Sequence, residues 1–380
     1  DAPSGVRSGK AAGAHTVVVP EAWVEGDPEA EEVFSMADDR VRSLADFDDG
    51  ALLGPAAPLL LACGNPTVDL SCEVDADELS ALGLDPGGEW HAGLGDDAKA
   101  KIVAFARSKA GVAASPGGAA LNTARVAALG GGAAVRVAFL GAVGADAHGE
   151  LLRCAAREAG VAALLKEVPG EDTGVVAVLV ERRSRDRALA AVRGASAAPW
   201  PVVVVVVAAV SGQAGLTAYV MTSQPRIAAV EELCARARRS GGAVAVNLAS
   251  AGVLPRARET LLRVLPGCRL AFGNLAELSA FCSLKGWPRQ PEEAASSPQG
   301  AALAWALVAA PRLAAELAED GVAVITAGAG ATVVAERGAA PRSFAVPELT
   351  AASVADTNGA GDAFAGGFLA RLLAGGCGLE

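Results

Sequence analysis

Residues 354–373, VADTNGAGDAFAGGFLARLL, carry the residue types and spacing best suited to chemistry. A strand-like lead is followed by Gly359, Ala360 and Gly361, and a helix is predicted to begin near Asp362. Small residues let the backbone approach a ligand closely, and the N–H groups at the positive end of the new helix would face that ligand. The segment therefore predicts an anion site suited to phosphate oxygens.

Asp362 does not fit a simple phosphate site, because its carboxylate would repel the anion. The conflict is resolved if Asp362 accepts a proton from an attacking hydroxyl, as in phosphoryl transfer. An Asp in the first turn of a helix is also a common capping residue with no chemical role. The motif alone leaves both interpretations open.

The elements that must position this motif follow an alternating pattern from residue 58 onward. Short apolar runs alternate with Ala-rich helical stretches, which is typical of a parallel sheet covered by helices. The expected strands are 58–64, 135–144, 175–180, 202–210, 243–248, 270–273, 322–328 and 331–336. The expected helices are 97–110, 121–130, 150–160, 225–241, 276–286, 301–321 and 361–375. We expect a turn at SGQAG (211–215), a break or kink at Pro311 and a surface loop over 287–300.

Composition narrows the function classes. The 380 residues suit one large α/β domain or two smaller ones, and the net charge of −11, without a Lys/Arg block, argues against a nucleic-acid-binding protein. No apolar run reaches the roughly 20 residues of a membrane helix. The seven cysteines include no C-x-x-C pair and the three histidines are scattered, which indicates reduced thiols and neither a disulfide framework nor a zinc site.

The acidity is concentrated in a leader, residues 1–58, which holds 12 acidic and 4 basic side chains. The remaining residues carry 31 acids and 28 bases, so the rest of the chain is almost neutral. We expect the leader to be disordered or loosely helical, and its acidity is unlike that of a transit peptide. The chain starts at Asp1 and not at Met, so the sequence leaves an organellar targeting signal open.

The segment D-T-N-G-A-G-D-A-F resembles the C-terminal signature of the ribokinase-like, or phosphofructokinase-B, carbohydrate kinases, in the form found in the adenosine kinase group. A second signature of that family lies at 117–141, GGAALNTARVAALGGGAAVRVAFLG. Shorter stretches resemble the adenosine kinase group at 64–71, 139–161, 171–180, 217–225 and 271–278. The resemblance runs from about residue 59 to the end of the chain.

The resemblance implies a ribokinase-like three-layer α/β/α sandwich with a small β-rich lid, formed by residues 59–380. The lid would be discontinuous, from about 66–116 and 170–196, and would close over the substrate. The site would lie at the carboxyl ends of the strands, where open α/β sheets bind their ligands.

The implied reaction is transfer of the γ-phosphate of ATP to the 5′-hydroxyl of adenosine, giving AMP in purine salvage. Asp362 would be the general base, and the backbone of Gly359, Ala360 and Gly361 would form the anion hole. Two alternatives stay open: a kinase of the same fold for another nucleoside or a sugar, and a catalytically weak or non-catalytic nucleoside-binding protein.

The resemblance also implies the acceptor-binding residues, which are Asn65, Asp69, Gly117, Gly118, Asn122 and Tyr219. Asp69 would accept hydrogen bonds from two ribose hydroxyls, although an Asp soon after the Asn-Pro turn signal is also an ordinary turn residue. Tyr219 would form an aromatic wall near the nucleobase, or would pack against the sheet.

For the ATP side, the resemblance implies Arg185, Asn274, Gly328, Thr357 and Asn358. Arg185 is the first choice among the four arginines of ERRSRDR (181–187), a segment that also suits a solvated hairpin tip. Asn274 and Glu277 would serve Mg²⁺, which is held mostly through waters and phosphates. The alternative is a capping box with a solvent-facing Glu. A monovalent cation such as K⁺ is a further implied ligand.

The implied partners are adenosine and ATP, with neither nucleic acid nor membrane, in a cytoplasmic monomer. Two departures from the family pattern stand out. Ala119 occupies a position where the family often has Ser, which removes one polar contact. The chain also ends at Glu380, soon after the helix of the motif, so we expect a truncated C-terminus that lacks the segments covering the adenine of ATP.

Overall fold

The computed structural model describes residues 59–84, 94–185, 187–198, 212–217, 221, 224–239, 242–291, 300–349 and 359–375, with a few positions before residue 41. The chain divides into two compact units, Asp1–Ala56 and Ala57–Glu380. In the first unit, β1 (Val17–Val18) and β2 (Asp39–Arg40) pair in parallel. The expectation of a disordered leader otherwise concerns residues outside the described part of the chain.

The second unit is built on a nine-stranded sheet with the order β15-β14-β13-β12-β11-β10-β3-β6-β7. The strands from β13 to β7 in this order run parallel, while β14 and β15 are antiparallel additions at one edge. The strands are β3 (Leu59–Cys63), β6 (Arg136–Gly144), β7 (Val161–Val168), β10 (Gly212–Thr217), β11 (Val244–Asn247), β12 (Leu270–Asn274), β13 (Val322–Ala327), β14 (Gly330–Glu336) and β15 (Arg342–Phe344).

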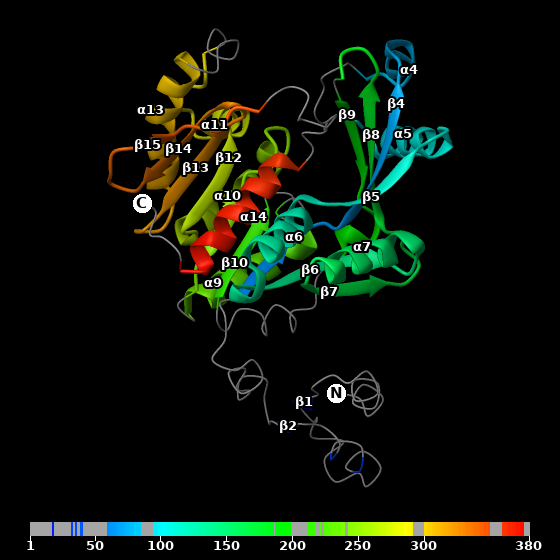
Figure 1. The fold of residues 1–380 in the computed structure, drawn as a ribbon, viewed down its shortest axis with the longest axis horizontal. Coiled ribbons are helices and arrows are strands. Elements are labelled where there is room, and N and C mark those ends of the chain that lie inside the picture. The colour runs from blue at the N-terminus through cyan, green and yellow to red at the C-terminus, as the bar shows by residue number, and fades with distance from the viewer. Residues whose placement is uncertain are drawn as a thin grey trace. The chain divides into compact units, whose positions relative to one another are not determined.

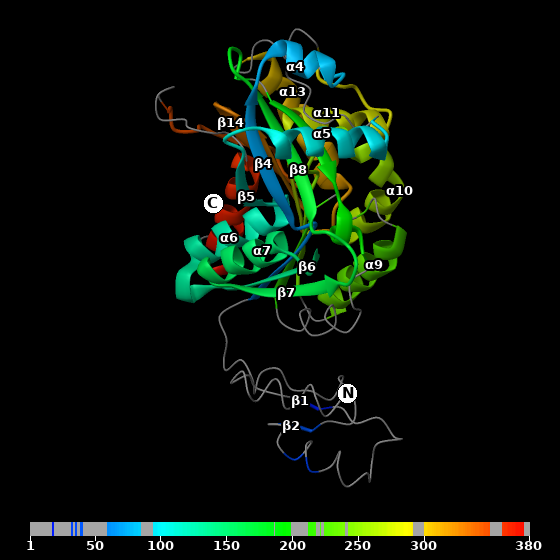
Figure 2. The ribbon, with the colours of Figure 1, turned by 90° about the vertical axis from the view of Figure 1, so that its right-hand side faces the viewer.

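Helices cover both faces of this sheet, because both faces of its central strands are apolar. In β3, Leu61 and Cys63 pack into one buried cluster, and Leu60 and Ala62 pack into another on the opposite face. Figure 2 shows the resulting three layers, with the sheet between two sets of helices. One set is α6 (Ala119–Gly131), α7 (Ala147–Glu158) and α14 (Ala360–Leu373); the other is α9 (Gln224–Arg239), α10 (Leu254–Val264), α11 (Leu275–Leu284) and α13 (Ala301–Ala315).

A second sheet of four strands, in the order β5-β4-β8-β9, stands apart from the first as a small lid (Figure 1). Its central pair, β4 and β8, is parallel, and its edge strands β5 and β9 are antiparallel to them. The elements are β4 (Thr67–Val74), β5 (Ala113–Gly117), β8 (Gly174–Glu181), β9 (Arg187–Val192), α4 (Ala76–Ala81) and α5 (Asp96–Ser108). The predicted α/β fold with a β-rich lid is confirmed.

Asp146 joins the start of α7 to the segment that enters lid strand β8. Its carboxylate accepts from the Gly149 N–H at 2.7 Å, from the Thr173 N–H at 2.8 Å and from the Thr173 hydroxyl at 2.6 Å. Burial raises the pKa of Asp146, but the bonds from Thr173 and Gly149 outweigh burial, so the pKa lies below its usual value. The carboxylate therefore fastens the base of the lid in its ionised form.

We expect Asp146→Asn to lower the free energy of unfolding by about 1–3 kcal/mol, because an amide nitrogen cannot accept from the buried Thr173 N–H. The pKa of Asp146 is depressed, so the deficit should be full at neutral pH and should shrink as pH falls through its folded-state pKa. Asp75→Asn is the matched control, since Asp75 caps α4 in an exposed capping box and Asn caps equally well. Urea unfolding of both variants at pH 7 and at about pH 2, below the usual pKa of an aspartate, measures the difference. Equal losses of stability in Asp146→Asn and Asp75→Asn at pH 7 would contradict the prediction.

One local prediction was wrong, and one of two alternatives at Pro311 was excluded. The expected SGQAG turn is instead part of β10, which pairs with β3 and β11 in the middle of the sheet. The small residues favour a turn locally, but pairing on both sides overrides that preference. The break expected at Pro311 does not occur, since α13 continues to Ala315, while the alternative of a kink stays a prediction. The strand expected at 202–210 lies outside the described residues.

None of the helices in the described part of the chain is both long enough and apolar enough to cross a membrane.

Candidate active site

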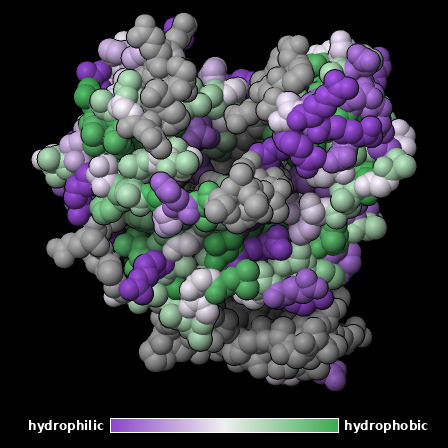
Figure 3. All heavy atoms as spheres, turned by 45° about the horizontal axis from the view of Figure 1, so that its top comes forward, coloured by the Kyte–Doolittle hydropathy of each residue, from purple (hydrophilic) through white to green (hydrophobic). Residues whose placement is uncertain are grey.

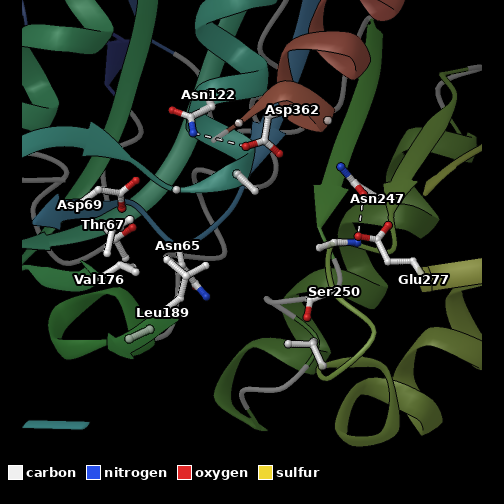
Figure 4. Close-up of a pocket in the computed structure, with 18 of the residues that line it drawn as sticks. Asn65, Thr67, Asp69, Asn122, Val176, Leu189, Asn247, Ser250, Glu277 and Asp362 are labelled. Carbon is white, nitrogen blue, oxygen red and sulfur yellow. Dashed lines mark hydrogen bonds between the residues drawn. The ribbon is translucent and has the colours of Figure 1, made fainter. Parts of the chain in front are cut away.

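A hollow of about 890 Å³ lies between the lid and the main sheet. Figure 3 shows its opening between two lobes, with hydrophilic side chains gathered on the lid side. In Figure 4, Thr67, Asp69 and Leu189 from the lid strands lie across the hollow from Asn247, at the end of β11, and Glu277, in the first turn of α11. The volume falls within the range of about 300–1,000 Å³ typical of small-molecule sites.

The beginning of α14 forms one wall of the hollow. Gly359 has a φ of 72°, a left-handed conformation that favours glycine, and its carbonyl accepts from the Ala363 N–H at 2.8 Å. The N-cap residue Gly359 has no side chain to cap the helix, and the first residues of α14 line the hollow, where their N–H groups have no partner within the helix. A Cβ added at Gly361 would meet nothing within 4 Å, which leaves open space for a ligand. This geometry suits an anion.

Asp362 lies in the first turn of α14 and points toward Asn122 on α6 (Figure 4). The Asn122 amide donates to Asp362 Oδ2 at 3.3 Å. Burial raises the pKa of Asp362 to about 7, and repulsion from Glu277 and Asp69 adds to the shift, while the Asn122 bond opposes it. A carboxylate with a pKa near neutrality is suited to taking a proton from a hydroxyl.

Close packing of α6 against α14 brings these two side chains together from positions 240 residues apart. Gly366 allows this approach, because a Cβ added there would lie 2.5 Å from the Thr123 carbonyl oxygen and 3.1 Å from the Ala127 nitrogen. Neither of those atoms belongs to a flexible side chain, so neither can move aside. The interhelical contact therefore determines where Asp362 lies.

Asp69 faces the hollow from β4, and it is only 8% exposed. Two glycines make room for the turn that precedes it. A Cβ at Gly117 would lie 2.3 Å from Asp69 Oδ1, and one at Gly118, where φ is 96°, would lie 2.4 Å from the Asn65 carbonyl oxygen. Asn65 also lines the hollow. Of the described residues predicted to bind the acceptor, Asn65, Asp69, Gly118 and Asn122 line the hollow, and Gly117 lies behind Asp69.

Asn274 and Glu277 form the capping box of α11, as one of the two sequence interpretations expected. Asn274 Oδ1 accepts from the Glu277 N–H at 2.9 Å, and Glu277 Oε2 accepts from the Asn274 N–H at 3.0 Å. Glu277 is not solvent-facing, however, because it is 7% exposed and lines the hollow. The cap fixes the carboxylate in a position where it faces the site.

This donor set fits Mg²⁺ held mostly by waters and phosphates. Glu277 contributes one carboxylate, Asn274 one amide oxygen, and the repulsion between Glu277 and Asp362 would be offset by a divalent cation. Among the described residues there is no cluster of three or more His, Cys, Asp or Glu side chains that could hold a metal ion by themselves.

Arg185 lines the hollow from the tip of the β8–β9 hairpin and has a φ of 61°. Its Nη1 donates to Glu73 Oε1 at 2.6 Å, an exposed ion pair within the lid. The basic side chains of Arg187, Arg256 and Lys99 line the same hollow. The structure thus offers several candidates for a phosphate contact and does not single out Arg185.

Sequence reasoning missed several lining residues, among them Asn247, Ser250 and Thr326. Each lies at or just after the carboxyl end of a main-sheet strand, and this position in the sequence could have identified them as candidate site residues. Gly328, in the turn between β13 and β14, is not among the residues lining the hollow. Tyr219, Thr357 and Asn358 lie outside the described residues, so their predicted roles stay predictions.

Residues 106–379 match the family described as pfkB family carbohydrate kinase, and the chain belongs to this family. Among curated relatives, the adenosine kinase of Schizophyllum commune is 32% identical over 152 residues, which cover 39% of this chain and 41% of that protein. Adenosine kinase 1 of Arabidopsis thaliana is 32% identical over 34% of this chain and 35% of that protein. The matched segments thus span less than half of these curated relatives.

Solved structures extend the likeness over most of the chain. The adenosine kinase of Anopheles gambiae, in complex with P1,P4-di(adenosine-5) tetraphosphate, is 25% identical with a TM-score of 0.70, covering 84% of this chain and 90% of that one. That of Trypanosoma brucei brucei is 25% identical with a TM-score of 0.68, covering 85% and 94%. The predicted ribokinase-like fold, the resemblance to adenosine kinases and the assignment to a kinase family are confirmed.

Proposed function

We propose that this chain transfers the γ-phosphate of ATP to the 5′-hydroxyl of adenosine and so produces AMP, a purine salvage reaction. The observation that carries the proposal is the placement of Asp362 in the first turn of α14, in a hollow that is also lined by Asp69. The similarity to adenosine kinases supports adenosine as the acceptor.

In this proposal the acceptor lies against the lid sheet. Asp69 accepts hydrogen bonds from two ribose hydroxyls, and the 5′-hydroxyl lies next to Asp362. Asp362 takes the hydroxyl proton as the oxygen attacks the γ-phosphorus, and the bond from that phosphorus to the β,γ-bridging oxygen breaks. The N–H groups at Ala360 and Gly361 stabilise the charge on the transferring phosphoryl group. The lid excludes water, which otherwise competes as acceptor.

Asn274 and Glu277 would hold Mg²⁺ through its waters, and the ion would neutralise charge on the ATP phosphates. Arg185 or Arg187 would contact the same phosphates from the lid. A monovalent cation such as K⁺ is included in the proposal on the resemblance alone. We further propose a monomer that acts in the cytoplasm on adenosine and ATP, without nucleic-acid or membrane partners; the six described cysteines, which form no disulfide, fit a reducing compartment.

A coupled ATP-consumption assay on adenosine, inosine, ribose and fructose tests the proposal. We expect turnover with adenosine well above that with the two free sugars, because the hollow offers room beyond the ribose contacts. Phosphorylation of ribose or fructose without adenosine would replace this proposal with a sugar kinase of the same fold. Adenosine binding without turnover on any acceptor would indicate a nucleoside-binding protein.

A further inference from the structure

Arg226, on α9, is the largest side chain that is completely buried in the described part of the chain. Burying a guanidinium costs free energy unless it is hydrogen-bonded, so the partners of Arg226 must offset that cost. Arg226 Nε donates to the Ala198 carbonyl oxygen at 2.9 Å, and Nη1 donates to Asn65 Oδ1. The side chain thus joins α9 to the base of the lid and to a residue in the wall of the hollow.

The bond to Asn65 determines how that amide is oriented. An Arg side chain has donors and no acceptor, so only the Asn65 oxygen can face it. The Asn65 amide nitrogen must then point the other way, and among the described residues it has no protein partner. Because Asn65 lines the hollow, this leaves an oriented N–H donor available to a ligand.

Two hydrogen bonds hold the Arg226 guanidinium between separate segments of the chain. Ala198 directly follows the short helix η3 (Gly194–Ala197), at the base of lid strand β9. Burial lowers the pKa of Arg226 to about 10, and repulsion from Arg193 adds to the shift, while Cys63 opposes it. The guanidinium therefore remains charged at neutral pH, and its bonds to Asn65 and Ala198 persist there.

We propose that Arg226 is a positioning residue, which holds the Asn65 amide so that its nitrogen donates to an acceptor atom of the bound nucleoside. Together with Asp69, which accepts from hydroxyls, the oriented Asn65 gives this wall both a donor and an acceptor. The inference rests on the proposed function for the identity of the ligand.

A double-mutant cycle between Arg226 and Asn65 tests the inference, with adenosine affinity measured by calorimetry beside KM and kcat. Arg226→Met keeps the volume but removes every donor. For Arg226→Met we expect about a tenfold loss of adenosine affinity, which corresponds to one net hydrogen bond of about 1.4 kcal/mol. The kcat and the KM for ATP should change little. In the Asn65→Ala background the same substitution should add almost nothing, and Arg226→Lys should restore part of the affinity.

Loss of the same size in both backgrounds would overturn the inference, because Arg226 would then act through general packing. No loss in Arg226→Met alone would also overturn it. If Arg226→Met does not fold, the cycle is run with Arg226→Lys and Asn65→Asp. The carboxylate of Asn65→Asp can still pair with Arg226 but offers no donor to the nucleoside. Retained adenosine affinity in Asn65→Asp would therefore contradict the inference. Failure of the proposed function is visible separately, as absent adenosine binding in the unmodified chain.

Discussion

Asp362→Asn will lower kcat by about 10²–10⁴-fold, the usual contribution of a general base, while adenosine binding persists. Asparagine has nearly the same shape and can keep its contact with Asn122, but it cannot accept a proton from the 5′-hydroxyl. Steady-state kinetics and calorimetry with adenosine measure the two effects. Turnover equal to that of the unmodified protein would contradict the role of Asp362 as base.

The pH dependence gives a second readout of the same carboxylate. A general base works in its ionised form, and burial raises the pKa of Asp362 to about 7. At limiting substrate, kcat/KM should therefore rise with pH up to about 7 and level off above it. Asn122→Ala removes a hydrogen bond that lowers this pKa, so the rising limb should move to higher pH. A rising limb that stays in place would show that Asn122 does not influence the base.

Measurements of stability show whether Asp362→Asn lowers kcat through the lost base or through damage to the fold. The folded state binds a proton at Asp362 more tightly than the unfolded chain, so ionisation of Asp362 destabilises the protein as pH rises. Asp362→Asn removes that cost. The variant should gain stability over the unmodified protein between about pH 4 and pH 7, and the gain should be constant above pH 7. Thermal unfolding across this range measures it.

Sequence could predict the elements with strong local signals. The runs at 135–144 and 322–328 became β6 and β13 with small boundary changes, because β-branched and apolar residues favour buried strands. The β10 segment could not be predicted in this way, since GQAGLT has weak strand preference and is a strand through its pairing with β3 and β11.

The site residues show the same difference between local sequence signals and tertiary contacts. Asp362 was predictable because its motif is contiguous, whereas the contact with Asn122 depends on two helices packing across 240 residues. Arg226 shows the limit most clearly. In the sequence it is one charge on an amphipathic stretch, PRIAAVEELCARARR, where a solvated side chain would be expected. Its complete burial comes from the acceptors at Ala198 and Asn65, which arrive from distant segments.

Two neighbouring glycines in α14 offer a test of the packing that positions Asp362. Gly366→Ala and Gly367→Ala both replace glycine inside a helix, a change worth about 0.5–1 kcal/mol in favour of the folded state. A Cβ at Gly367 meets nothing within 4 Å, so that variant should be more stable and fully active. A Cβ at Gly366 would meet the Thr123 carbonyl oxygen at 2.5 Å, so the helices must separate.

We therefore expect Gly366→Ala to lose stability, because overpacking typically costs about 1–3 kcal/mol and outweighs the gain in helix propensity. The larger effect should be on kcat, since a shift of about 1 Å in a catalytic group can cost on the order of 10²-fold. Urea unfolding and steady-state kinetics on the matched pair measure both quantities. If Gly366→Ala were as active and as stable as Gly367→Ala, the contact between α6 and α14 could not be what holds Asp362 in place.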